Sequence, residues 1–151
     1  QFYISLADVY HRLEEHKRSD DYFEKALELN PSSPTVLNNY AYYLSERGVR
    51  LDDALEMTEK CNRLAPNNGV FLDTWAWVLY KKGKYSEALE KINECAKFGG
   101  AESGEVLEHW GDILLKLNKK EEALAKWKEA ATKEDATKNV QQKIESLQRD
   151  E

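Results

Sequence analysis

The sequence predicts an all-α fold, a solenoid of four antiparallel helix-turn-helix repeats closed by one further helix. The first observation behind this prediction is a short motif that recurs four times, at spacings of 35, 34 and 35 residues. Its copies are Ser19-Asp20-Asp21-Tyr22, Asp53-Ala54-Leu55, Glu87-Ala88-Leu89 and Glu122-Ala123-Leu124. A period of this length is typical of stacked supersecondary units, each too small to bury its own apolar face.

The second observation is a composition that favours ordered helices. Of the 151 residues, 41% are hydrophobic and 33% are charged, while only seven are glycine and three are proline. The formal net charge of −6 argues against a surface for nucleic acid or anionic lipid, because phosphate binding needs a basic face. No stretch approaches the ~18 apolar residues that span a bilayer, and the sequence shows no signal peptide.

The third observation is that apolar residues follow the helical period within each repeat. The first repeat is expected at residues 1–33, with apolar stripes of Tyr3, Leu6, Ala7 and Tyr10, then Phe23, Ala26 and Leu27. The second is expected at residues 34–68, with stripes of Leu37, Tyr40, Ala41 and Leu44, then Ala54, Leu55 and Cys61. Pro31 and Pro66 lie where one repeat must end, because proline interrupts a helix.

The same pattern continues in the second half of the chain. The third repeat is expected at residues 69–102, with stripes of Leu72, Trp75, Ala76 and Leu79, then Tyr85, Ala88, Leu89, Ile92 and Ala96. The fourth is expected at residues 103–135, with stripes of Leu107, Trp110, Gly111 and Leu114, then Ala123, Leu124, Trp127 and Ala130. Gly48, Gly83 and Asn118 follow the first helices of the last three repeats, where a left-handed residue is expected to end a helix.

The two ends of the array are expected to differ. Residues 136–149 predict a capping helix with one narrow apolar stripe, formed by Val140, Ile144 and Leu147. The N-terminal repeat lacks such a cap, although apolar residues such as Phe2 and Ile4 lie at its start. We expect an upstream repeat or a second copy to cover them. Residues 1–151 are interpreted as one domain, and a start at Gln1 rather than Met suggests a fragment of a longer chain.

These repeats resemble the tetratricopeptide repeat, whose pattern combines an aromatic residue, small residues at the helix crossing and a closing proline. The resemblance covers roughly residues 1–135. Two positions depart from it: Ser19 replaces the first Ala of a second helix, and Thr58 stands where other repeats have Phe23 and Trp127. The resemblance implies a right-handed superhelix whose first helices line a concave groove that binds ligands.

The resemblance also bears on source and location. The stretches 39–44 and 72–77 are similar to those of tetratricopeptide proteins from Bacteroides-type bacteria, many of which are exported. This similarity favours a bacterial protein of the cell envelope, although composition alone leaves the compartment open. Cys61 and Cys95 lie 34 residues apart at equivalent repeat positions, and buried free thiols are favoured there over a disulfide or a metal or redox site.

Candidate binding residues emerge when the packing positions are removed from the first helices. Tyr42, Trp77 and Tyr80 are large aromatic residues outside the core stripe, whereas Trp75, Trp110 and Trp127 fall on it. An aromatic cluster ringed by polar groups is typical of a peptide-binding patch, although sideways packing between repeats is the alternative. The polar groups expected on the same concave surface are Asn38, Asn39, Asp73, Lys81, His11 and Asp112.

Catalytic and metal-binding patterns are weak in this chain. It has no HExxH motif, no CxxC pair and no glycine-rich phosphate loop. His11 lies one turn from Asp8 and His109 one turn from Asp112, spacings that carboxylate-rich helices produce by chance. We therefore expect no enzyme activity, no cofactor and no metal.

The function predicted from the sequence is a non-catalytic scaffold that binds a peptide or protein segment in the concave groove. Acidic groove residues favour a partner with basic or neutral polar groups; nucleic acid and membrane insertion are not expected. Two alternatives remain at this stage. The chain is either a structural array that forms homo-oligomers through its uncapped N-terminal face, or a segment of a multidomain protein whose activity lies elsewhere.

Overall fold

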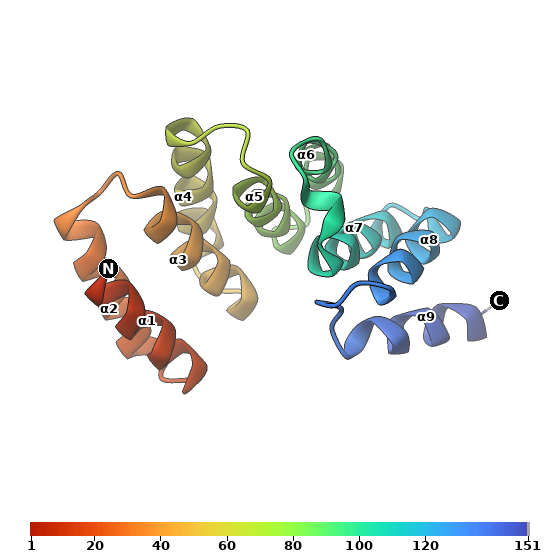
Figure 1. Ribbon diagram of the computed structural model, residues 1–151, viewed down its shortest axis with the longest axis horizontal. Coiled ribbons are helices and arrows are strands. Elements are labelled where there is room, and N and C mark those ends of the chain that lie inside the picture. Colours follow the sequence, from red (N-terminus) through yellow and green to blue (C-terminus); the bar gives the residue numbers. More distant parts are fainter. Residues whose placement is uncertain (151) are drawn as a thin grey trace. The chain divides into compact units, whose positions relative to one another are not determined.

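The all-α prediction is confirmed by a computed structural model, which describes residues 1–150 (Figure 1). This range contains nine α-helices and one short 3₁₀ helix, and no strand. The helices form two compact units that are described separately, the first from Gln1 to Pro66 and the second from Asn67 onward. The first unit contains α1 (Phe2–Arg12), α2 (His16–Leu29), α3 (Pro34–Arg47) and α4 (Leu51–Leu64). The second contains α5 (Gly69–Lys81), α6 (Tyr85–Lys97), η1 (Gly100–Glu102), α7 (Gly104–Lys116), α8 (Lys120–Ala131) and α9 (Asn139–Arg149).

In the first unit, α1 packs on α2 and α3 packs on α4, because each pair turns an apolar stripe inward. Between the two hairpins, Phe23 on α2 stacks on Tyr40 on α3 at a ring distance of 4.9 Å. The Tyr40 hydroxyl donates to Glu24 Oε1 at 2.8 Å, which satisfies the polar end of a ring that is otherwise buried.

The two departures from the repeat pattern are both accommodated by hydrogen bonds inside the first unit. The Ser19 hydroxyl is buried and donates to the Ala7 carbonyl across the helix crossing, at 2.9 Å. The Thr58 hydroxyl is also buried and donates to the Leu55 carbonyl at 2.8 Å. A buried hydroxyl with a partner avoids most of the free energy that an unpaired one would lose.

The predicted helix ends are confirmed in both units. Gly48 and Gly83 have φ angles of +69° and +80°, and Asn118 has +61°. Glycine reaches this region without strain, and asparagine tolerates it better than most residues. Each of these residues therefore ends its helix and allows the chain to turn back within a few residues.

In the second unit, α5 packs on α6 and α7 packs on α8, while α9 lies against α8 (Figure 1). At the α7–α8 crossing, a Cβ atom added to Gly111 would lie 2.3 Å from Trp127 Cδ1, so only glycine fits. The apolar stripe of α9, formed by Val140, Ile144 and Leu147, joins a core cluster that also holds Leu107 and Trp127.

Cys61 and Cys95 are buried free thiols, as predicted. Cys61 Sγ lies 3.3 Å from the Pro34 carbonyl oxygen, and Cys95 Sγ lies 3.1 Å from that of Gly69. Burial raises the pKa of Cys61 to about 11 and that of Cys95 to about 12. Both side chains therefore stay protonated at neutral pH and act as small packing residues. None of the helices in residues 1–150 combines the length and apolar character that crossing a bilayer needs.

Candidate functional site

The structure distributes the predicted site residues over the two units. His11, Asn38, Asn39 and Tyr42 belong to the first unit. Asp73, Trp77, Tyr80, Lys81 and Asp112 belong to the second. Within each unit these side chains come from α1 and α3, or from α5 and α7, which are the first helices of their hairpins.

The aromatic residues of the second unit form a stack, which we define by Trp77, Tyr80 and His109. Trp77 and Tyr80 lie one turn apart on α5, and their rings stack at 4.6 Å with an interplanar angle of 10°. The Trp77 ring also stacks on the ring of His109, which belongs to α7, at 4.0 Å. Trp77 and Tyr80 are both partly exposed, and Lys81 Nζ lies 5.4 Å from the centre of the Trp77 ring. The stack is thus a preformed aromatic surface with a cation beside it.

His109 connects the aromatic stack to two neighbouring carboxylates. Its Nδ1 lies 2.9 Å from Asp73 Oδ1, and its Nε2 lies 3.9 Å from Glu105 Oε1. Asp73 and His109 are each only 7% exposed. Burial alone would lower the pKa of His109, but the adjacent Asp73 carboxylate outweighs burial and raises this pKa.

A second polar cluster lies further along α7, where α9 covers it. Lys143 on α9 donates to Glu108 Oε2 at 2.6 Å and to both carboxylate oxygens of Asp112 at 2.9 Å. Trp127 Nε1 also donates to Asp112 Oδ1, at 3.2 Å. Asp112 is only 9% exposed, and burial raises its pKa even though Lys143 acts in the opposite direction. Asp112 is therefore occupied by α9 and does not present a free carboxylate to a ligand.

Two site residues of the first unit, His11 and Tyr42, lie beside Tyr43, which sequence reasoning did not select. The Tyr43 ring stacks on His11 at 3.6 Å, and its hydroxyl donates to Asp8 Oδ1 at 3.1 Å. The Tyr42 ring lies 6.0 Å from the Tyr43 ring. In the same unit, Asn38 Nδ2 donates to Asn39 Oδ1 at 3.2 Å. Among residues 1–150, the buried Asn38 Oδ1 has no hydrogen-bond partner.

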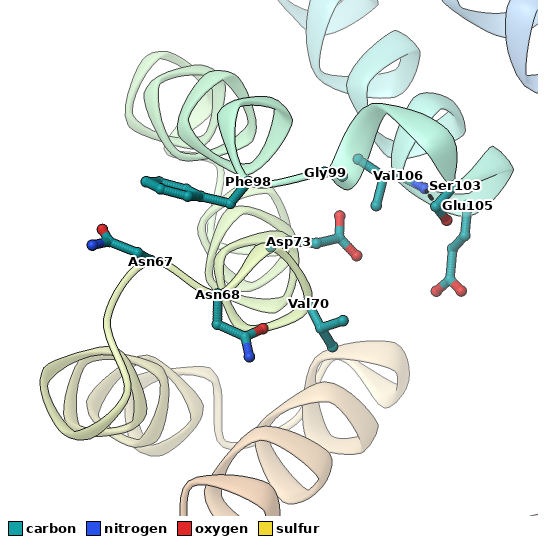
Figure 2. A pocket seen from close by; sticks show the side chains of 11 residues that line it. Asn67, Asn68, Val70, Asp73, Phe98, Gly99, Ser103, Glu105 and Val106 are labelled. Carbon is teal, nitrogen blue, oxygen red and sulfur yellow. Dashed lines mark hydrogen bonds between the residues drawn. The ribbon is translucent and has the colours of Figure 1, made fainter.

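A pocket of about 480 Å³ opens beside Asp73 in the second unit (Figure 2). Figure 2 shows Asp73 reaching from α5 toward the start of α7, where Ser103, Glu105 and Val106 lie. Its wall is partly apolar, because Val70 and Phe98 both expose their side chains there. The other lining residues are Asn67, Asn68, Gly69, Gly99 and Gly100.

The three tryptophans predicted at core positions differ in burial. Trp127 is buried against α7 and α9, whereas Trp75 and Trp110 are only partly buried. Lys91 Nζ lies 4.0 Å from the Trp75 ring centre, and Lys126 Nζ lies 3.8 Å from that of Trp110. Lysine side chains therefore cover two of these rings on the solvent side.

The repeat period could have predicted two of the contacts that sequence reasoning missed. His109 meets a residue 36 positions earlier, Asp73, and Tyr43 meets a residue 35 positions earlier, Asp8. Both separations are close to one repeat, so equivalent positions of successive first helices face each other. Lys143 carries no such signal, because α9 lies outside the repeat pattern.

Three family profiles match the sequence. Two tetratricopeptide repeat profiles match residues 1–33 and 22–56, and a tetratricopeptide repeat-like domain profile matches residues 74–149. A search of curated proteins found no match.

Solved structures similar to the chain share its fold at low sequence identity. PilF from Pseudomonas aeruginosa is 21% identical with a TM-score of 0.83, over 98% of this chain and 67% of that one. A tetratricopeptide repeat protein from Parabacteroides merdae is 18% identical with a TM-score of 0.83, over 97% of this chain and 56% of that one. YrrB, described as a protein with an unusual peptide-binding site, is 20% identical with a TM-score of 0.67, over 97% of this chain and 75% of that one. These similarities show the all-α repeat fold predicted from the sequence.

Proposed function

Because the chain belongs to the tetratricopeptide repeat family, we propose that it is a non-catalytic scaffold that binds a peptide or protein segment on the surface of its first helices. The observation that carries this proposal is the aromatic stack. Trp77 and Tyr80 are held parallel by stacking and yet remain partly exposed. Rigid aromatic side chains of this kind are frequent anchors in protein interfaces, because they bury a large area with little loss of conformational freedom.

The polar groups around the stack support a partner with basic or neutral polar side chains. The carboxylates of Asp73 and Glu105 line the adjacent pocket, while Lys81 Nζ lies 5.4 Å from the centre of the Trp77 ring. The formal net charge of −6 adds a long-range preference for cationic segments. YrrB, which shares this fold, carries a peptide-binding site according to its description, and this supports the same class of function here.

A selection from a phage-displayed library of random peptides, followed by titration of the enriched peptides, tests the proposal. We expect Trp77→Ala to weaken binding by at least tenfold, because truncating a central aromatic anchor costs about 2 kcal/mol or more. Trp75→Ala is the matched control, since Trp75 lies on the same helix but is covered by Lys91. Equal weakening by both substitutions, or a library from which no peptide is enriched, would overturn the proposal.

A second candidate function is self-association through α1. This helix exposes Phe2 and Val9, and Leu13 directly after it is also exposed; Phe2 is 71% exposed. Exposed apolar residues at one end of a repeat array are a natural contact for a second copy or another repeat. If α1 mediates self-association, sedimentation velocity will show a mass that rises with protein concentration, and Phe2→Glu will abolish the rise. A mass that stays monomeric at all concentrations would exclude this candidate.

A further inference from the structure

The strongest further feature is a convergence of three metal-ligating side chains in the second unit, one of which, His109, also belongs to the aromatic stack. Asp73 comes from α5, while Glu105 and His109 come from successive turns of α7. One ligand atom from each residue lies within 4.8 Å of the other two. We propose that Asp73, Glu105 and His109 form a binding site for a divalent transition-metal ion of the Zn²⁺ class.

The distances suit an ion held between the imidazole and a carboxylate. His109 Nε2 and Glu105 Oε1 are 3.9 Å apart, which is too long for a hydrogen bond. Zinc binds histidine nitrogen at about 2.0–2.1 Å and carboxylate oxygen at about 2.0–2.2 Å, so a small movement lets one ion bind both atoms. Imidazole with carboxylate is a ligand set that Zn²⁺, Co²⁺ and Ni²⁺ accept and that Ca²⁺ and Mg²⁺ use less readily.

Asp73 lies beside the ring nitrogen of His109 that would not bind the ion. Its carboxylate lies 2.9 Å from His109 Nδ1, a distance at which it can accept a proton from that nitrogen, and Nε2 is then the ring nitrogen on the Glu105 side. Metal-bound histidines usually donate their other ring nitrogen to a carboxylate or carbonyl in this manner.

The imidazole is also held in position before any ion arrives. Trp77 stacks on the His109 ring with an interplanar angle of 18°, and His109 is nearly inaccessible to solvent. A ring fixed by stacking and by a carboxylate loses little conformational freedom on binding a metal. Preorganisation of this kind raises affinity, because the cost of ordering the ligand is already met in the free protein.

Charge favours a cation at this place. The polar face of α7 carries Glu105, Glu108 and Asp112, and Lys143 bridges the last two. The Asp73 and Glu105 pair is bridged by His109 instead. Two carboxylates therefore flank the buried imidazole, and a divalent ion bound beside it is attracted to both in a region of reduced dielectric.

The site is reachable from solvent. Asp73 and Glu105 both line the pocket of about 480 Å³ that opens between the starts of α5 and α7 (Figure 2). An ion can enter through this pocket, and water molecules can occupy the coordination positions that the protein does not supply. The site would thus hold the ion with two protein ligands, Glu105 and His109, while Asp73 orients the imidazole.

Metal titration of the whole chain, after treatment with EDTA and dialysis, tests the proposal. We expect isothermal titration calorimetry with ZnCl₂ to give one ion per chain, and Co²⁺ to give visible absorption of a site with nitrogen and oxygen ligands. Glu105→Gln should weaken the affinity at least tenfold, and its partly exposed side chain makes this a change that leaves the fold intact. His109→Gln should abolish binding, with circular dichroism to verify that this variant is folded.

His11→Gln is the matched control, because His11 lies in the first unit, outside the proposed site, where its ring is 5.8 Å from that of His16. Binding that survives His11→Gln and disappears in His109→Gln supports the proposal, as do ¹H–¹³C NMR signals of His109 that move when Zn²⁺ is added. No binding at millimolar Zn²⁺, or binding lost equally in His11→Gln, would overturn it. The titration contains no peptide, so its outcome does not depend on the proposed peptide-binding function.

Discussion

Residues at the helix crossings decide how closely the hairpins pack. Gly111 brings α7 against the Trp127 indole so closely that a Cβ atom would lie 2.3 Å from the ring. Ser19 lies at the crossing of the first hairpin, on its second helix, and hydrogen-bonds the Ala7 carbonyl. Both residues are small. Gly111 avoids a collision with the indole of Trp127, whereas Ser19 has a buried hydroxyl that needs its hydrogen bond. Substitutions at the two positions therefore fail for different physical reasons.

Gly111→Ala tests the close approach. We expect it to destabilise the fold by about 1–3 kcal/mol, because the added methyl group must displace a buried indole. Gly83→Ala is the control, since its Cβ would meet nothing within 4 Å and the only penalty is the left-handed backbone, about 1–2 kcal/mol. Urea denaturation followed by fluorescence measures both. A Gly111→Ala variant with an unchanged indole emission spectrum would show that Trp127 is not displaced and contradict this account.

At the scale of elements, α9 is fixed to α7 by charge as well as by its apolar stripe. Lys143 bridges Glu108 and Asp112, two carboxylates that are each less than a tenth exposed. Removal of the cation leaves two buried negative charges without compensation. A buried salt bridge of this kind adds little net stability to the fold. Removal of one partner is nevertheless strongly destabilising, so the packing of α9 depends on Lys143.

Lys143→Met keeps the length of the side chain and removes its charge. We expect the free energy of unfolding at pH 7 to fall by on the order of 3 kcal/mol, because a buried pair has lost one partner. The deficit should shrink as the pH is lowered toward 4.5. The pKa of Asp112 is already raised by burial, so this group takes up its proton early and its charge no longer opposes folding.

Lys138→Met, at an exposed position just before α9, is the control for loss of a positive charge. A Lys143→Met deficit that stays constant between pH 7 and pH 4.5 would show that lost packing, and not the uncompensated carboxylates, causes it.

The start of α7 gives a second prediction at this scale. Asp135, in the segment between α8 and α9, accepts hydrogen bonds from the backbone N–H of Gly104 at 2.7 Å and from the Ser103 hydroxyl at 2.9 Å. The bond from the Gly104 N–H is the main cause of the lowered pKa of Asp135. Asp135→Ala should destabilise the fold by about 1 kcal/mol, the usual effect of losing a helix cap.

A lowered carboxyl pKa stabilises the folded state above the pKa of the unfolded chain, and this contribution disappears as pH falls through the folded value. The difference between wild type and Asp135→Ala, measured by thermal unfolding, should therefore be largest near pH 7 and smallest near pH 3. An equal difference at both pH values would assign the effect to packing.

The helices themselves were predictable from the sequence, because small residues, glycines and apolar stripes recur with the repeat. Gly83 shows this well, since its position in the repeat already indicates the left-handed backbone that it adopts. The surroundings of Asp112 were not predictable. It lies on a first helix, where the repeat pattern places ligand-facing residues, but Lys143 reaches it from a helix outside the pattern. Contacts between elements of different kinds have no periodic signal.

At the scale of the whole molecule, the division into two compact units has a measurable consequence. All four tryptophans, Trp75, Trp77, Trp110 and Trp127, lie in the unit that begins at Asn67. Indole fluorescence therefore reports on that unit alone, whereas far-ultraviolet circular dichroism reports on the helices of both. In repeat arrays stability is a sum of local terms, so separate regions can unfold at different denaturant concentrations.

We expect the urea midpoint from circular dichroism to lie below the midpoint from fluorescence. The first unit leaves Phe2 and Val9 exposed on α1 and Leu13 exposed just after it, whereas α9 covers apolar and charged groups in the second unit. Gly111→Ala should move the fluorescence midpoint and leave the early part of the dichroism transition unchanged, because that part arises from the first unit. Coincident transitions in both proteins would show instead that the chain unfolds in one cooperative step, with coupling between the units strong enough to override their different stabilities.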